Sequence, residues 1–156
     1  MSTLFKKIID KEIPAKVVYE DEDILAFLDI SQNTKGHTLV IPKEETRSVL
    51  SADEKVITKV NAVAQKIAKD MINIFNAKGV NILTNAESVA GQTVFHYHVH
   101  VIPRYTEDEL VFKTTENDLD IGQVHKEILK YYETLWCRYG THRILLFKED
   151  SEKFNE

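Results

Sequence analysis

The stretch Val94-Phe95-His96-Tyr97-His98-Val99-His100-Val101-Ile102-Pro103-Arg104 alternates histidines with aromatic and β-branched residues. Such residues favour an extended chain, in which successive side chains point to opposite faces. We therefore expect a strand with His96, His98 and His100 on one face and an apolar face turned toward the core. Pro103 has no N–H group and is expected to end the regular pairing of this strand.

A row of three imidazoles admits three interpretations. The first is a polar strand face that is rich in histidine. The second is a metal site, because imidazoles two residues apart, at about 6.6 Å, could share one zinc ion. That ion would need a further ligand from elsewhere, and the single cysteine, Cys137, has no companion. The third is catalysis, with one imidazole as nucleophile and its neighbours controlling protons.

Residues 96–102 fit the pattern His-φ-His-φ-His-φ-φ, in which φ is hydrophobic. This pattern resembles the motif of the histidine triad (HIT) family of nucleotide-binding hydrolases and transferases. Other stretches resemble the same family in the same order: 4–9, 27–30, 36–43, and Asn85 with Gly91-Gln92-Thr93. The resemblance covers roughly residues 3 to 105.

Composition limits the class of protein. The chain has 156 residues, of which 43% are hydrophobic, enough for one globular domain that buries about 70% of its unfolded surface. The net charge of −5 argues against broad binding of nucleic acids or anionic membranes. The N-terminal stretch lacks the apolar core of a signal peptide, and no apolar window is long enough to span a membrane. One cysteine excludes an internal disulfide and fits a reducing, cytoplasmic location.

Hydrophobic periodicity predicts an α+β fold. We expect a sheet of about five antiparallel strands with one short helix, one long helix and a C-terminal helical extension. The expected helices cover residues 3–11, 51–75 and 121–136, and the expected strands cover 17–20, 24–30, 38–41, 80–85 and the histidine stretch. The long helix should begin with a Ser51–Glu54 capping box. Its apolar stripe, expected to pack on the sheet, consists of Val56, Val60, Val63, Ile67, Met71 and Ile74.

Residues 1–105 are expected to form the histidine-triad core. Residues 106–156 are expected to be an extension packed on the same domain, with a mobile tail from residue 148. The apolar run 143–147 could be a strand or a patch against a partner subunit. His125 and His142 are expected on the surface. The resemblance further implies a homodimer that continues the sheet across subunits.

The resemblance also implies a purine-nucleotide site. In it, an apolar slot holds the purine ring, Asp29 accepts hydrogen bonds from the ribose hydroxyls, and the Gly91-Gln92-Thr93 loop offers donors to phosphate. Asn85 should lie beside the histidines, because a short loop joins its strand to theirs. The implied nucleotide-binding residues are Phe5, Ile8, Phe27, Asp29, Ile30, Asn85, Gly91, Gln92 and Thr93.

The mechanism implied by the resemblance uses four catalytic histidines. His98 would attack the α-phosphorus of a nucleoside 5′-phosphate, forming a nucleotidyl-histidine that water hydrolyses. His100 would donate a proton to the leaving atom, while His96 and His37 would orient the His98 ring and set its tautomer. The transferase branch of the family typically replaces the third histidine with glutamine. Histidine at position 100 therefore favours a hydrolase, with purine nucleoside phosphoramidates as substrates.

Three alternatives stay open at this point. The chain could hydrolyse dinucleoside polyphosphates, bind purine nucleotides without turnover, or bind a metal. Many bacterial relatives carry a Cys-x-x-Cys pair near the start that completes a structural zinc site. Thr3 and Lys6 stand at the corresponding positions here, and neither supplies a thiolate. We therefore expect no bound metal and no cofactor.

Overall fold

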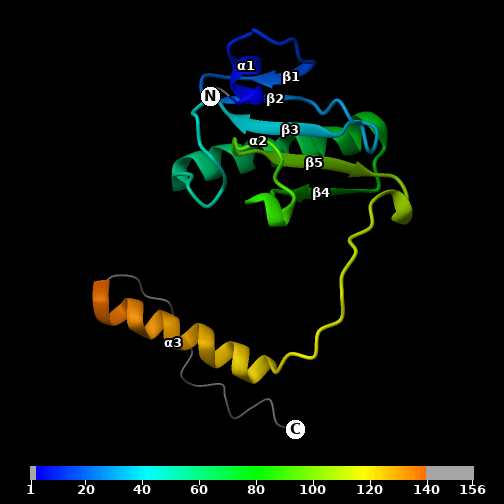
Figure 1. Cartoon of the computed structure of the whole chain (residues 1–156). Helices are drawn as coiled ribbons and strands as arrows, with labels where there is room; N and C mark the ends of the chain where they lie inside the picture. Colours follow the sequence, from blue (N-terminus) through cyan, green and yellow to red (C-terminus); the bar gives the residue numbers. More distant parts are fainter. Residues whose placement is uncertain (1–2, 140–156) are drawn as a thin grey trace. The chain divides into compact units, whose positions relative to one another are not determined.

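The computed structural model describes residues 3–139 (Figure 1). The chain divides into two compact units, with the boundary between Phe112 and Lys113. The boundary lies a few residues beyond the expected end of the core at residue 105. No described helix is long and apolar enough to cross a membrane.

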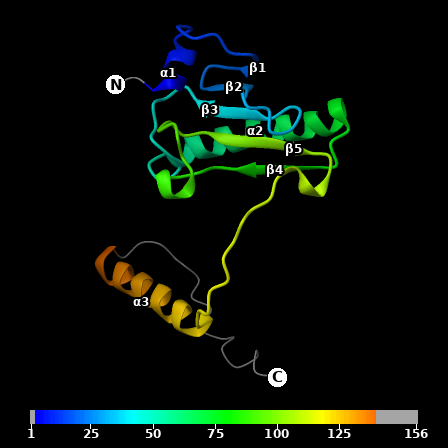
Figure 2. The ribbon, with the colours of Figure 1, turned by 45° about the vertical axis from the view of Figure 1, so that its right-hand side comes forward.

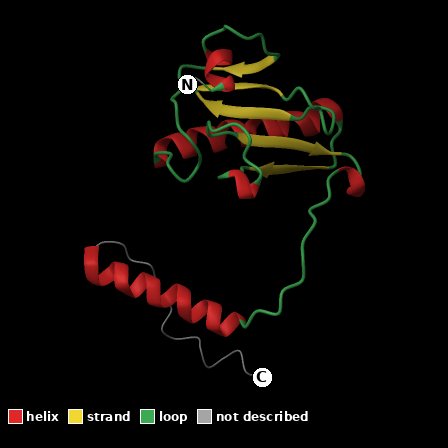
Figure 3. Cartoon of the chain, viewed as in Figure 1, coloured by secondary structure: helices red, strands yellow, loops and turns green. Residues whose placement is uncertain are grey.

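The first unit is built on a five-stranded, fully antiparallel sheet, which confirms the expected α+β class. The strand order is β1-β2-β3-β5-β4. The strands are β1 (Val17–Glu20), β2 (Ile24–Leu28), β3 (Thr38–Pro42), β4 (Gly79–Leu83) and β5 (Val99–Arg104). The helices of this unit are α1 (Leu4–Ile9) and α2 (Glu54–Phe75), with short 3₁₀ turns η1 (Ser88–Ala90) and η2 (Glu107–Glu109). Figure 3 shows the helices in red and the strands of the sheet in yellow.

The sheet has an apolar cluster on each face, because its central strands alternate between two sets of buried side chains. One cluster joins the α2 side chains Val60 and Ile67 to Tyr97, Val99 and Val101. The other cluster packs Phe5 of α1 against neighbouring strands and includes Leu25, Phe27, Leu39 and Ile41. Helices α1 and α2 therefore cover opposite faces (Figure 2). The histidines alternate with Tyr97, Val99 and Val101 and so face the α1 side.

Helix α2 begins differently from the expectation. Its N-cap is Asp53, whose side chain accepts a hydrogen bond from the Lys55 N–H. The Ser51 hydroxyl instead donates to the Ser48 carbonyl and closes the preceding turn. The predicted capping box is therefore wrong, because a better-placed carboxylate two residues later takes the cap position.

Two strand ends also differ from the expectation. β2 stops at Leu28, although Asp29 N–H still donates to the His37 carbonyl at 2.9 Å. β5 continues through Pro103, which lies opposite Val80 of β4. Proline is tolerated there because its ring nitrogen faces β3, and β3 begins only at Thr38, opposite Val101.

The second unit contains α3 (Ile121–Tyr139), which confirms the expected helix and extends it by one turn. His125 on this helix is exposed, as expected. The run 143–147, His142 and the tail from residue 148 lie outside the described residues. The expected packing of this extension on the core stays a prediction.

The α2 stripe gives a matched test of the core. Ile67 is 4% exposed, whereas Ile74, which was expected to pack on the sheet, is 63% exposed near the helix end. We expect Ile67→Ala to lower the free energy of unfolding by about 2–5 kcal/mol, because it leaves a cavity. Ile74→Ala should change it by less than about 0.5 kcal/mol. Urea unfolding of both variants measures this, and equal losses would contradict the assigned packing.

Candidate active site

The three histidines lie in the segment that leads into β5 and at the beginning of the strand itself. His96 and His98 precede the strand, and His100 lies within it, opposite Leu39 of β3 and Leu83 of β4. The approach is held by two contacts outside the ladder. The Tyr97 N–H donates to the Thr46 carbonyl at 2.6 Å, and the Thr84 hydroxyl donates to the His98 carbonyl at 2.7 Å. The side chains therefore alternate between the two faces already before β5 begins. His96 and His98 are buried, and His100 is half-buried.

His98 is held as the tautomer that a nucleophile requires. Its Nδ1 lies 2.7 Å from the backbone carbonyl oxygen of His96. A carbonyl only accepts, so Nδ1 carries the proton, and the neutral ring keeps its lone pair on Nε2. Burial lowers the pKa of His98 below its ordinary value, against the opposing effects of that carbonyl and of Asp29. The Nε2 atom is therefore unprotonated at neutral pH.

His96 joins three segments of the chain. Its Nε2–H donates to the Pro42 carbonyl at 2.8 Å, which leaves Nδ1 as an acceptor for the Thr3 hydroxyl at 3.4 Å. Thr3 is also the N-cap of α1, and its hydroxyl accepts from the Lys6 N–H. Burial is the main cause that lowers the pKa of His96. The side chain is a positioned, neutral support for the loop that carries His98.

His100 and His37 form a direct imidazole pair. His37 Nε2 lies 3.0 Å from His100 Nδ1 and 3.7 Å from Asp29 Oδ2. The carboxylate favours a proton on His37 Nε2, which is then donated to His100 Nδ1. Neutral His100 consequently carries its own proton on Nε2. Burial, followed by His98 and His37, lowers the pKa of His100 to about 4.

His37 itself is buried, and its Nδ1 has no hydrogen-bond partner among the described residues. This fits a proton on Nε2, because a buried acceptor without a partner is tolerated more often than a buried donor. Burial lowers the pKa of His37, and Asp29 partly opposes that shift. The structure places His37 beside the triad, as expected.

Asp29 lies at the end of this chain of contacts. Its Oδ1 accepts hydrogen bonds from the Ser31 N–H at 2.8 Å and from the Ser31 hydroxyl at 2.9 Å. Burial acts to raise the pKa of the Asp29 carboxyl, but the Ser31 hydrogen bonds and the nearby imidazoles outweigh it, so the pKa is lowered. Ser31 was not expected in the site. Its hydroxyl two residues after a carboxylate is the signal that could have found it.

The expected apolar slot is only partly assembled. The Phe5 ring meets the His98 ring edge-on at 5.1 Å between centroids and the Phe27 ring at 5.6 Å. Ile8 packs against this cluster, but Ile30 does not and is fully exposed. The reason is that β2 ends at Leu28, which places Ile30 in the following turn rather than on the strand face.

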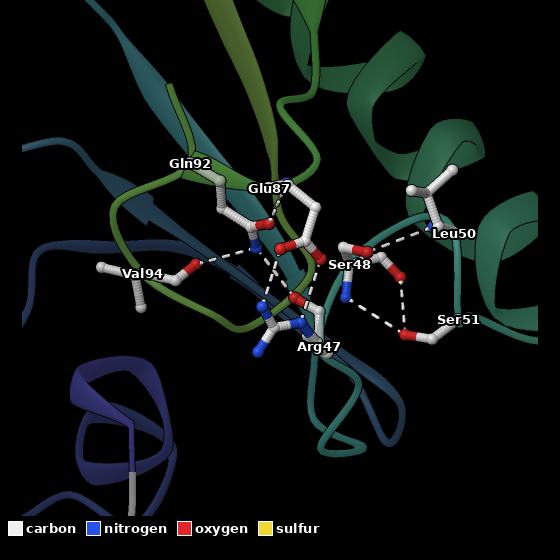
Figure 4. A network of polar contacts seen from close by, with 7 residues as sticks. All are labelled: Arg47, Ser48, Leu50, Ser51, Glu87, Gln92 and Val94. Carbon is white, nitrogen blue, oxygen red and sulfur yellow. Dashed lines mark hydrogen bonds and ion pairs between the residues drawn. The ribbon is translucent and has the colours of Figure 1, made fainter. Parts of the chain in front are cut away.

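The loop between β4 and β5 carries the remaining predicted residues. Gly91 has φ +89°, and a Cβ atom there would lie 3.6 Å from the Asn85 amide nitrogen. Thr93 is exposed, so its hydroxyl is free to meet a ligand. The buried Gln92 amide is fully engaged: it accepts from the Glu87 N–H and donates to the carbonyls of Arg47 and Val94 (Figure 4).

Gln92 therefore braces the loop through its side chain. The backbone N–H groups of Gly91 and Gln92, which were expected to be donors to phosphate, already donate to the carbonyls of Ser88 and Glu87. Arg47 and Glu87, which complete this network, were not anticipated. They are 40 residues apart in the sequence, and no local pattern links them.

Three side chains of a kind that can bind a metal ion also lie close together. Asp29, His37 and His100 each place one atom within 4.8 Å of the others. Two imidazoles on one zinc ion would keep their nitrogens about 3.3 Å apart, from Zn–N bonds of about 2.05 Å in a tetrahedral site. The observed 3.0 Å between His37 and His100 is instead an ordinary hydrogen-bond length. The geometry thus favours a direct hydrogen bond between the two imidazoles over a shared metal ion.

A family model for the HIT domain matches residues 10–107. The chain belongs to the HIT family. The "Protein hit" of Bacillus subtilis (strain 168) is 44% identical over 133 residues, which cover 81% of this chain and 92% of that protein. The crystal structure of a HIT family protein from Bacillus anthracis has a TM-score of 0.75 at 42% identity, covering 84% of this chain and 95% of that one.

A Zn-bound histidine triad family protein from Mycobacterium smegmatis is also similar, with a TM-score of 0.68 at 37% identity. The match covers 86% of this chain and 98% of that one. The start of the present chain does not fit a thiolate zinc site. Thr3 caps α1 and contacts His96, and Lys6 pairs with Asp10 through its ammonium group.

The absence of structural zinc therefore stays a prediction. Untagged protein rinsed with EDTA should contain well under about 0.1 zinc ion per chain, because hydroxyl and ammonium groups replace the thiolates that such sites use. Elemental analysis by plasma mass spectrometry measures this. A content of about one ion per chain that survives EDTA would contradict it.

The lowered pKa values of the site histidines predict a loss of stability in mild acid. Above about pH 6.5 the unfolded chain leaves these imidazoles neutral, as the folded chain does. Below that pH the unfolded chain binds protons while the folded site resists them, down to about 4 for His100. The free energy of unfolding should therefore fall as the pH drops from about 6.5 toward 4.

Urea unfolding at about pH 7, 6 and 5 measures this dependence, since carboxyl groups contribute little in that interval. His100→Asn should show a shallower decline than the wild type, because one group that resists protonation has been removed. A midpoint that stays constant from pH 7 to pH 5 would show that the site histidines protonate equally well in the folded state.

Proposed function

We propose that this HIT protein is a hydrolase that cleaves purine nucleoside 5′-phosphoramidates at the α-phosphorus. The observation that carries the proposal is the hydrogen bond from His98 Nδ1 to the His96 carbonyl. That bond, together with burial, keeps the lone pair of Nε2 available at neutral pH. Such an imidazole is an activated nucleophile.

The first step would form a bond between His98 Nε2 and phosphorus while the P–N bond to the leaving group breaks. The departing nitrogen needs a proton, and His100 Nε2–H is the adjacent donor, since the two rings lie 5.0 Å apart between centroids. His37 supports that tautomer of His100 through its 3.0 Å contact. Asp29 in turn favours the proton on His37.

In the second step, water would attack the phosphorus of the nucleotidyl-histidine. Its proton passes to His100, the P–N bond to His98 breaks, and the free nucleotide leaves with both imidazoles restored. Burial and the neighbouring imidazoles lower the pKa of His100 to about 4, so the ring is neutral before and after the cycle. The proton that it lends in the first step and regains in the second is the one on Nε2. No bound metal is required for the atoms to balance.

Binding of the nucleotide would use the groups around the histidines. Phe5 and Phe27 are buried in the apolar cluster that underlies the expected purine slot. Asp29 Oδ2 is not occupied by Ser31 and can accept from the ribose. Gly91 allows close approach of the loop backbone, and the Thr93 hydroxyl can donate to phosphate. Homodimer formation, a cytoplasmic location and the lack of nucleic-acid or membrane partners stay predictions.

The first experiment compares wild type with His98→Asn on a fluorogenic adenosine 5′-phosphoramidate. We expect kcat to fall by roughly 10⁴-fold or more, because the nucleophile is lost. The Kd for AMP, measured by calorimetry, should change by less than about threefold, since asparagine keeps much of the polar surface. His125→Asn, on the exposed face of α3, is the matched control and should behave as wild type.

Other outcomes assign the site differently. Preference for diadenosine tetraphosphate, still lost in His98→Asn, would keep the nucleophile and change the substrate. AMP binding without turnover of either compound would show a nucleotide-binding protein instead of an enzyme. Turnover that survives in His98→Asn would overturn the proposed mechanism.

A further inference from the structure

Outside the histidine site, an ion pair ties two loops together. Arg47, in the segment between β3 and α2, binds the carboxylate of Glu87 with two parallel hydrogen bonds. Nε lies 3.0 Å from Oε1, and Nη2 lies 2.7 Å from Oε2 (Figure 4). Both side chains are about half exposed, where single ion pairs contribute little. The bidentate geometry makes the Arg47–Glu87 ion pair stronger and more directional than an ion pair with a single hydrogen bond.

Arg47 makes two further contacts to the same region. Its carbonyl accepts a hydrogen bond from the Gln92 amide, and its guanidinium lies 4.2 Å from the centre of the Phe95 ring. Phe95 directly precedes His96. One residue therefore contacts both the beginning and the end of the loop that leads from β4 to the histidines.

Glu87 needs this support because of its backbone. Its φ of +71° and ψ of +160° lie in a region that only glycine adopts readily. The Glu87 carbonyl accepts from the Gln92 and Ala90 N–H groups, and the Glu87 N–H donates to the Gln92 side chain. These hydrogen bonds and the ion pair with Arg47 together hold a conformation that the residue itself does not favour.

We propose that Arg47 is a positioning residue for the nucleotide phosphate, which acts by holding Glu87 in this strained conformation. The inference rests on the proposed function, which makes a nucleotide the ligand of this loop. Without the ion pair, Glu87 would relax toward negative φ and shift the segment that carries Gly91 and Thr93. The consequence is weaker nucleotide binding with little change in the chemical step, because the His96 and His98 rings are held by the Pro42 and His96 carbonyls, which the ion pair does not contact.

The strain provides a specific test. Glycine at position 87 adopts the required φ and ψ without help, so the ion pair should no longer matter in its presence. Arg47→Met should raise the Kd for AMP and the KM for the phosphoramidate by about three- to tenfold, the loss expected for one good ion pair, and leave kcat within about twofold. Arg47→Met combined with Glu87→Gly should return both constants to within about twofold of wild type.

Two measurements separate this role from general destabilisation. Amide hydrogen exchange of residues 88–92 should speed up in Arg47→Met and recover in the double variant. Lys59→Met is the matched control, because it removes another exposed ion pair, with Asp23, outside this network. It should change none of these quantities.

An unchanged Kd and unchanged exchange in Arg47→Met would overturn the proposal. So would a double variant that binds AMP as weakly as Arg47→Met. If the wild type binds no nucleotide, the proposed function fails and with it the role toward phosphate. The exchange data would then decide separately whether Arg47 holds the loop.

Discussion

The hydrogen bond from the His98 ring to the carbonyl two residues before it is the constraint on which the site depends. It requires the chain to be extended at His96 and the ring to lie close to its own backbone. The apolar residues between the histidines satisfy the first condition, because Tyr97 and Val99 are anchored under α2. The second condition follows from burial beneath Phe5, which leaves the ring little room to turn. The packing of two helices on opposite faces of the sheet thus fixes the orientation of the His98 ring and of the lone pair on its Nε2 atom.

The site is also a line of neutral imidazoles in a place that disfavours their charged forms. Three of the four rings have a partner for the proton: a backbone carbonyl for His96 and for His98, and the His100 imidazole for His37. These partners make the tautomers distinct although the residues are chemically identical. A strand face with the same histidines but other neighbours would offer no such division of roles.

The sequence predicted the elements whose cause is local. Alternation at residues 94–102 placed the histidines on one face, and the helical stripe found Val60 and Ile67. It placed Ile74 against the sheet and Ile30 in the apolar slot, but both side chains are exposed. Periodicity does not show where a helix or strand stops packing against its neighbours. It could not identify the engagement of Gln92 or the pairing of Arg47 with Glu87, because those contacts join segments far apart in the chain. Thr3 was noted only for the thiolate it lacks, and its contact with His96 required the fold.

Pro103 protects the register of the central strands. Sliding β5 by two residues along β3 would keep every apolar side chain on its own face, so hydrophobic patterning does not forbid it. That slide would carry His96 away from the Pro42 carbonyl and His100 away from His37. It would also bring Pro103 opposite Thr38, where Val101 now stands and where the ladder needs an N–H donor. Pro103, which is not part of the histidine row, therefore helps to set where the imidazoles lie along the sheet, because the nearest competing alignment would lose a backbone hydrogen bond.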